Sequence, residues 1–123
     1  MGPINRDHKL ISAYTCDVVG NLAKITELDF AGYAGGVILL PSGSPITSIT
    51  FYASCARANG NQTAQVQSAF QPLYDNTNTT PVAIAFANLT IPSIVGIPDA
   101  CFGAGSLKLV TNAKGSVDIS LKG

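Results

Sequence analysis

The only histidine of this sequence, His8, is the residue best suited to general acid–base chemistry. A Ser–His–Asp hydrolase would need this histidine in a formed cleft, beside a serine nucleophile and an orienting acid. His8 instead falls in a polar, proline-containing segment at residues 1–9, whereas catalytic bases are held on rigid elements. We therefore predict that residues 1–9 form a flexible arm and that His8 is a solvated side chain within it.

The acidic residues are not grouped in a way that predicts catalysis. Glu27 and Asp29 are two positions apart, so on a strand they share one face, and a solvated face explains them better than the paired carboxylates of a glycosidase. The stretch Asp-Asn-Thr-Asn that starts at Asp75 has part of a calcium-loop pattern but lacks the later glutamate. It predicts an Asx-type turn.

The cysteines do not form a recognisable site either. Cys16, Cys55 and Cys101 are far apart and include no Cys-x-x-Cys pair, so they favour neither a disulfide framework nor a zinc site. We expect free thiols, with Cys55 buried because it is in phase with Phe51 in an alternating stretch. Together these patterns predict no catalysis, no metal and no cofactor.

Composition sets wider limits on the partners. The chain has 123 residues, which fits one domain, and seven basic residues balance seven acidic ones. Without a basic surface to attract phosphate groups, we predict that neither nucleic acid nor a membrane is a partner. No apolar run reaches the ~18 residues of a membrane helix, and the first residues lack the build of a signal peptide. Without a secretory signal, we interpret the sequons at Asn61, Asn78 and Asn88 as chance products of a chain rich in Thr and Asn. The free thiols agree with a reducing site of synthesis.

The low charge also predicts assembly. Charged residues make up 11% of the chain, under half of the usual quarter, and the net charge is zero. Small proteins of this kind tend to self-associate, because little repulsion keeps their surfaces apart. We expect a homo-oligomer whose charge-poor faces are covered by neighbours; a monomer with a hydroxyl- and amide-rich exterior is the alternative.

The first half of the chain predicts short strands separated by turns. Residues 10–18 are rich in β-branched and aromatic types, and the glycines after residues 22–30 favour a strand there over a helical turn. Residues 37–40 form the continuous apolar run of a strand that is buried on both faces or lies at an interface. Residues 46–55 alternate as a half-buried strand, and the turn chemistry of residues 41–45 predicts a hairpin between these two strands.

The second half continues this pattern. After a polar loop at residues 56–65, residues 66–73 predict a strand that Pro72 confines to an edge. A polar turn follows, and then residues 82–87 alternate between large side chains that point to the core and alanines that leave the other face flat. Residues 88–105 form the longest connection, too apolar for a free loop.

The last third of the chain contains a predicted helical turn and two strands. Asp99 is expected to cap the helical turn at residues 99–102. Residues 106–111 and 116–122 predict a closing hairpin, in which the last strand turns every second side chain into the core. Seven or eight strands with regular turn signals predict an all-β fold, an antiparallel β-sandwich of jelly-roll or immunoglobulin-like kind that spans residues 10–123 as a single domain.

Four segments carry a resemblance to a known class of proteins. In order they read GGVILLPSGSPITSITFYAS, FQPLYDNTNTTPV, IPDACFGAGSLKLVTN and VDISLKG at the terminus. Over about residues 32–123 this order resembles small proteins of tailed bacteriophages, encoded among virion structural genes. The resemblance implies a capsid-associated role, such as decoration or cement, or a tail or fibre module. Its motifs are structural, so it implies no active-site residue.

From this resemblance we expect a non-enzymatic virion structural protein, made in the host cytoplasm, that decorates the capsid and stabilises the phage head. Its partners would be the major capsid protein, other virion proteins and further copies of itself. Flat apolar and hydroxyl surface should make these contacts, because long-range charge attraction is missing. The candidate interface residues are Tyr52, Tyr74, Ala83, Ala85, Ile94 and Val95.

Two other functions remain open at this point. A carbohydrate- or receptor-binding module on a tail or fibre would need Tyr52 or Tyr74 exposed beside polar loops, where an aromatic ring can stack on a sugar. A small hydrolase would need a cleft that brings His8 together with an acid and a nucleophile.

Overall fold

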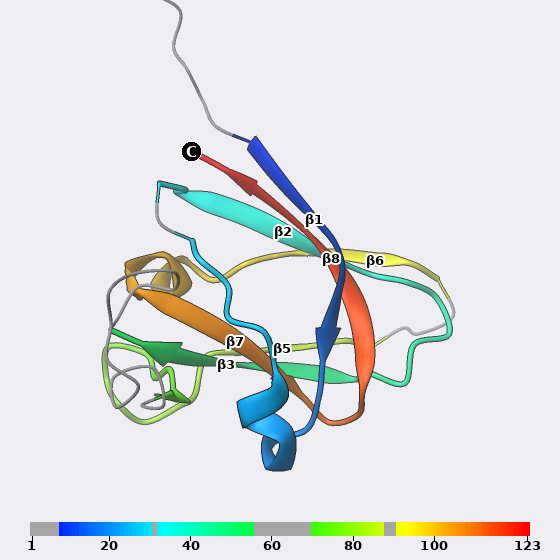
Figure 1. The fold of residues 1–123 in the computed structure, drawn as a ribbon, viewed down its shortest axis with the longest axis horizontal. Helices are drawn as coiled ribbons and strands as arrows, with labels where there is room; N and C mark the ends of the chain where they lie inside the picture. Colours follow the sequence, from blue (N-terminus) through cyan, green and yellow to red (C-terminus); the bar gives the residue numbers. More distant parts are fainter. Residues whose placement is uncertain (1–7, 31, 56–69, 88–90) are drawn as a thin grey trace, which may run out of the picture.

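The computed structural model describes residues 8–30, 32–55, 70–87 and 91–123, which form two antiparallel sheets packed face to face (Figure 1). Sheet A has the strand order β1 (His8–Cys16), β8 (Gly115–Lys122), β2 (Gly35–Leu40), β6 (Ser93–Gly96). Sheet B is built around β3 (Ser48–Ser54), which pairs with β4 (Gln71–Pro72), β5 (Ala83–Ala85) and β7 (Ser106–Thr111). The prediction of an all-β sandwich is confirmed.

The core fills the space between the two sheets, and the alternating pattern of the strands is what builds it. In β8 the three inward side chains, Val117, Ile119 and Leu121, are at most 1% exposed. Ile49 and Phe51 of β3 face them from sheet B and are fully buried. Because successive side chains of a strand point to opposite faces, the residues between them lie on the outer faces of the sandwich.

One glycine lets two strands of sheet A approach closely. A Cβ atom at Gly36 of β2 would lie 2.4 Å from the main-chain oxygen of Ser120 and 2.8 Å from the side chain of Leu121. No other residue fits this position without moving β8. The glycine pair that the sequence places before the apolar run therefore belongs to the strand itself and keeps β2 in register with β8.

Both predicted hairpins are wrong, because each pair of strands is divided between the sheets. Residues 41–47 lead from β2 in sheet A to β3 in sheet B, and residues 112–114 lead from β7 in sheet B to β8 in sheet A. The side-chain oxygen of Asn112 accepts hydrogen bonds from the main-chain N–H groups of Thr47 (2.7 Å) and Ser48 (3.2 Å), which ties the two crossings together. The same turn residues serve a hairpin and a crossing between sheets, so turn chemistry alone does not choose between them.

Residues 22–30 do not form the predicted strand. The 3-10 helix η1 (Val19–Lys24) comes first, and afterwards only Leu28 makes an isolated bridge, to Leu107. This segment follows the edge of β7, since the N–H of Leu28 donates to the carbonyl of Leu107 at 2.7 Å and that of Thr111 donates to the carbonyl of Asp17 at 2.9 Å. The chain therefore covers a sheet edge here without forming a strand of its own.

Other boundaries also differ from the predictions. Residues 88–105 contain β6, which the sequence does not reveal, as well as the helical turn η2 (Asp99–Gly103). Asp99 is not the cap of that turn, because Pro98 holds the N-cap position and no side chain caps it. Cys55 follows the last residue of β3 and is exposed instead of buried.

The predicted N-terminal arm and the strand predicted at residues 66–73 also have different bounds in the structure. β1 begins at His8, so the last two residues assigned to the N-terminal arm belong to a strand, while residues 1–7 lie outside the described residues. The polar loop predicted at 56–65 and the first part of the strand predicted at 66–73 also lie outside them. The described remainder of that strand is the two-residue β4, which among the described strands pairs with β3 alone, in keeping with the edge position that Pro72 predicts.

Candidate interaction surfaces

An apolar exposed surface lies on the side of sheet A that faces away from the core. We call it the outer A face and define it by Leu10, Val37, Leu39 and Ile94, with Ser120 between them. Leu10 is 63% exposed and Ile94 67%, although side chains of both types are more often buried. The residues come from four strands, so the patch crosses the whole sheet.

Strand register brings these residues together. Ser120 of β8 pairs with Leu10 of β1 on one side and with Val37 of β2 on the other. One row further along the sheet, Leu39 pairs with both Asp118 and Ile94. Residues paired directly across a sheet share a face, so the two rows form one continuous surface with a shallow hollow of about 200 Å³.

The two ends of the outer A face carry opposite charge. Asp118 lies in the same row as Leu39, and its Oδ1 accepts a hydrogen bond from the main-chain N–H of Ala13 at 2.8 Å. At the other end, Lys122 is paired with His8 on one side and with Gly35 on the other. One row of uncharged residues, Leu10, Ser120 and Val37, therefore separates the row of Asp118 from the row of Lys122.

His8 and Ser120 form the one arrangement on this face that resembles catalytic chemistry. The Nε2 atom of His8 is 2.8 Å from the Oγ atom of Ser120, close enough for a histidine to activate a serine. Both side chains lie on an open sheet face, and the described residues give His8 no bonded carboxylate. β8 pairs with a strand on each side, so its main-chain N–H groups serve the sheet and do not form an oxyanion hole.

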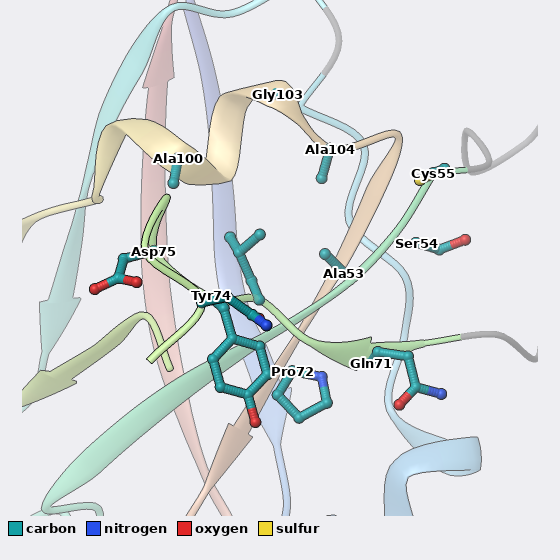
Figure 2. Close-up of a pocket in the computed structure, with 12 residues that line it drawn as sticks. Ala53, Ser54, Cys55, Gln71, Pro72, Tyr74, Asp75, Ala100, Gly103 and Ala104 are labelled. Atoms are coloured by element: carbon teal, nitrogen blue, oxygen red, sulfur yellow. The ribbon is translucent and has the colours of Figure 1, made fainter. Parts of the chain in front are cut away.

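A larger hollow of about 540 Å³ lies at one end of sheet B, between the end of β3, β4 and η2 (Figure 2). Tyr74, which is 42% exposed, and Pro72 line one side, and Ala100 and Gly103 of η2 line another. Its polar side chains include Gln71 and Asn78. An aromatic ring with amides at the rim can bind a sugar or a peptide turn.

The turn at the rim of this end hollow is the Asx-type turn that the sequence predicts. Oδ1 of Asp75 accepts hydrogen bonds from the hydroxyl of Thr77 at 2.7 Å and from the main-chain N–H groups of Thr77 and Thr79. These bonds, with the Thr77 hydroxyl first among them, hold the pKa of the Asp75 carboxyl below its ordinary value. Asp75 is therefore a carboxylate whose structural role is to close the turn.

The outer face of sheet B is partly covered, unlike the outer A face. Lys108 of β7 points to this side but is buried, because its Nζ donates to the carbonyl of Leu22 in η1 at 3.0 Å and lies 4.6 Å from the ring centroid of Phe70. This cation–π contact and the hydrogen bond satisfy the charge. The contrast leaves the outer A face as the open apolar side of the sandwich.

The six residues predicted as interface candidates lie in separate places. Ala83 and Ala85 are exposed on the outer face of sheet B, where they pair with Thr50 and Ser48 to form the flat alanine face. Tyr52 is half-buried further along the same face, and Tyr74 lines the end hollow. Ile94 is on the outer A face.

The sixth candidate does not fit the role proposed for it. Val95 is partly buried and packs against the core, because it follows Ile94 in β6 and so points to the opposite side of the sheet. The predicted pair therefore separates into one surface residue and one core-facing residue.

Sequence reasoning missed the residues that complete the outer A face, namely Leu10, Val37, Leu39 and Asp118. One signal pointed to part of it, since the continuous apolar run at residues 37–40 predicted burial on both faces or an interface. The outward positions of that run, Val37 and Leu39, are the exposed and half-exposed ones. Their neighbours on this face come from distant segments, such as Ser120 beside Val37 and Ile94 beside Leu39, which local patterns do not reveal.

The described residues contain no group of three or more His, Cys, Asp or Glu side chains that could hold a metal ion. The structure has three free cysteines, of which Cys16 and Cys101 are buried and Cys55 is exposed. Burial raises the pKa of both the Cys16 and the Cys101 thiol to about 12, so these two thiols stay protonated near neutral pH. In the part of the chain that the structure describes, no helix has the length and apolar character needed to span a membrane.

Comparison of the chain with protein-family models, with curated proteins and with solved structures finds no match.

Proposed function

We propose that this chain is a non-enzymatic virion structural protein, a decoration or cement protein that stabilises a phage head by covering and linking its subunits. The observation that carries the proposal is the outer A face. Four large aliphatic side chains from three strands, β1, β2 and β6, lie together on an open sheet face of a charge-poor chain. Contiguous apolar patches of this kind are often functional, which supports contact with a neighbouring protein.

The chemistry of the described side chains supports a structural role. Ser120 and His8 are near each other, but within the described ranges no carboxylate orients His8, and the main-chain donors of β8 serve the sheet instead of an oxyanion. Two of the three thiols are buried and protonated, so they are unsuited to nucleophilic attack. The exposed apolar side chains of the outer A face suit binding to another protein by shape and apolar contact.

A reconstitution experiment tests the proposal. The purified chain is added to virus particles that lack it, and bound protein is separated by sedimentation at low salt and at molar salt. The proposal predicts binding that saturates and that persists at high salt, because apolar contacts are weakly screened. Absence of binding under both conditions would contradict it.

The end hollow favours one alternative, a carbohydrate- or receptor-binding module on a tail or fibre. Tyr74 is exposed there beside Gln71 and Asn78, so a sugar ring could stack on the tyrosine and bond to the amides. A glycan array with the parent chain and a Tyr74→Ala variant distinguishes the two functions. Specific glycan binding that Tyr74→Ala abolishes would replace the capsid proposal with this one.

A further inference from the structure

We propose that the outer A face binds the same face of a second copy of this chain, with the strands of the two sheets antiparallel. This inference names the partner of the surface on which the proposed function rests. A two-fold axis generates the contact. It lies between sheet A of one copy and sheet A of the other, runs perpendicular to the strands, and passes over the row that contains Ser120. Such a contact is self-complementary, as a symmetric dimer requires.

Charge selects this arrangement. The axis exchanges the rows on either side of Ser120, so Asp118 of one copy lies opposite the partner's Lys122, and Lys122 lies opposite the partner's Asp118. An axis along β8 would instead place Asp118 against the partner's Asp118, which is repulsive. Packed sheets keep their strands within about 30° of each other, a rotation that the long lysine side chain tolerates.

Shape selects the same arrangement. In β2, Leu39 and Gly35 lie on either side of Val37, so the axis places Leu39 opposite the partner's Gly35. A Cβ atom at Gly35 would meet nothing within 4 Å, so the glycine leaves open space on this face. Leu39 of one copy fills the space at the partner's Gly35, while Leu10 and Val37 meet their own counterparts in the row of the axis.

The size of the face predicts a weak dimer. Four strands about 4.8 Å apart and about five residues long, at a rise of ~3.3 Å, cover roughly 300 Å² in plan. A standard interface buries about 800 Å² on each partner, so this contact falls in the class of weak complexes. We expect a dissociation constant of roughly 10 µM to 1 mM for the free chain, a range in which assembly on a repeating surface would strengthen the contact.

Sedimentation equilibrium of the full chain, at concentrations up to about 1 mM, measures this association. The first variant is Gly35→Leu, which fills the space that the partner's Leu39 needs and leaves its own sheet unstrained. It should weaken dimerisation about 100-fold or abolish it. Gly20→Leu, which adds the same bulk in η1 where a Cβ also meets nothing, is the matched control and should dimerise like the parent.

The second set of variants tests the charge pairing. Lys122→Glu turns two attractions into two repulsions and should weaken the dimer roughly 10-fold. Adding Asp118→Asn to Lys122→Glu removes the repulsion and keeps the acceptor for the N–H of Ala13, so dimerisation should return to within about threefold of the parent. Circular dichroism and a melting curve verify that each variant is folded.

Two results would overturn the inference. One is a parent chain that stays monomeric up to about 1 mM, and the other is a parent oligomer that Gly35→Leu and Lys122→Glu leave unchanged. These results concern the free chain only, so they are distinct from failure of the virion proposal. A chain that binds particles but remains monomeric in solution overturns the dimer alone, and a chain that dimerises as described but never binds particles overturns the virion role alone.

Discussion

The carboxylate of Asp118 accepts a hydrogen bond from the main-chain N–H of Ala13 at 2.8 Å, across the edge of sheet A. Ala13 has a φ angle of +53°, in the left-handed region that side chains other than glycine rarely adopt. It lies where the register between β1 and β8 shifts, between Ile11 and Tyr14. Asp118 thus stabilises a β-bulge by accepting from an N–H group that the regular ladder does not use.

Ala13→Gly should therefore stabilise the fold. Glycine adopts positive φ without the steric cost that alanine pays, and this outweighs its greater freedom in the unfolded chain. We expect the free energy of unfolding to rise by about 0.5–1 kcal/mol in urea titrations. As a control, Ala85→Gly in regular strand β5 should lower it by a similar amount, and a loss of stability at both positions would contradict the bulge geometry.

Ile119→Ala should destabilise the domain strongly. Ile119 is 0% exposed at the centre of β8, between β1 and β2, so its removal leaves a cavity in the core. The expected loss is ~2–5 kcal/mol of unfolding free energy, a large part of the stability of a domain this size. Ile94→Ala, at an exposed position of β6, should change it by less than about 0.5 kcal/mol. Equal melting of Ile119→Ala and the parent would show that β8 is peripheral.

Stability should fall at alkaline pH. Burial raises the pKa of Cys16 and Cys101 to about 12 from an ordinary value of 9.0, and it also raises that of Tyr14. A raised acid pKa means that the folded form holds its proton longer than the unfolded form, so stability is complete below about pH 9 and is lost as pH rises toward 12. Between about pH 7.5 and pH 10.5, each buried thiol should lower the free energy of unfolding by roughly 1–2 kcal/mol.

Urea titrations at the two pH values check this, with Cys101→Ala as the control that lacks one titrating thiol. That variant should lose less stability than the parent over the same interval. In native protein at mildly alkaline pH, a thiol reagent should modify only the exposed Cys55 among the three cysteines. Rapid modification of all three would show that Cys16 and Cys101 are accessible.

The flat alanine face offers a second test of how the chain docks. Ala85 is exposed and pairs with Ser48, so Ala85→Glu should leave the fold intact and release the protein from particles if this face contacts the capsid. If the parent chain stays bound to particles in molar salt, as measured by co-sedimentation, the contact is apolar. Val95→Glu is unsuitable for this purpose because Val95 packs against the core, so the charge would unfold β6. Unchanged particle binding by Ala85→Glu would exclude the alanine face as the contact.

Where a strand forms, the sequence predicts which of its side chains face the core, because alternation is a local property. Ile119 and Phe51 are buried as their phase predicts, and Ala83 and Ala85 are exposed. The pairing of strands is not local. Asn112 bonds to Thr47, 65 residues away, and this contact belongs to a crossing between sheets that the turn residues alone do not distinguish from a hairpin.

The candidate surface shows the same division between local and distant information. Ile94 is exposed, whereas its neighbour Val95 packs against the core, because the two follow the alternation of a strand that the sequence did not reveal. The outer A face forms only when β1, β2, β6 and β8 lie in register, so Leu10 and Val37 meet through Ser120 and not through any motif. Its residues could be recognised only from the folded sheet.

Quantitative mass spectrometry of purified virions tests the central proposal most directly. Particles are isolated from host lysate on a density gradient, with and without a molar-salt wash, and peptides of this chain are counted against those of the major capsid protein. The virion role predicts the chain in a fixed ratio to the capsid protein, in many copies per particle and unchanged by the wash. Particles that are infectious and stable but contain none of this chain would contradict it.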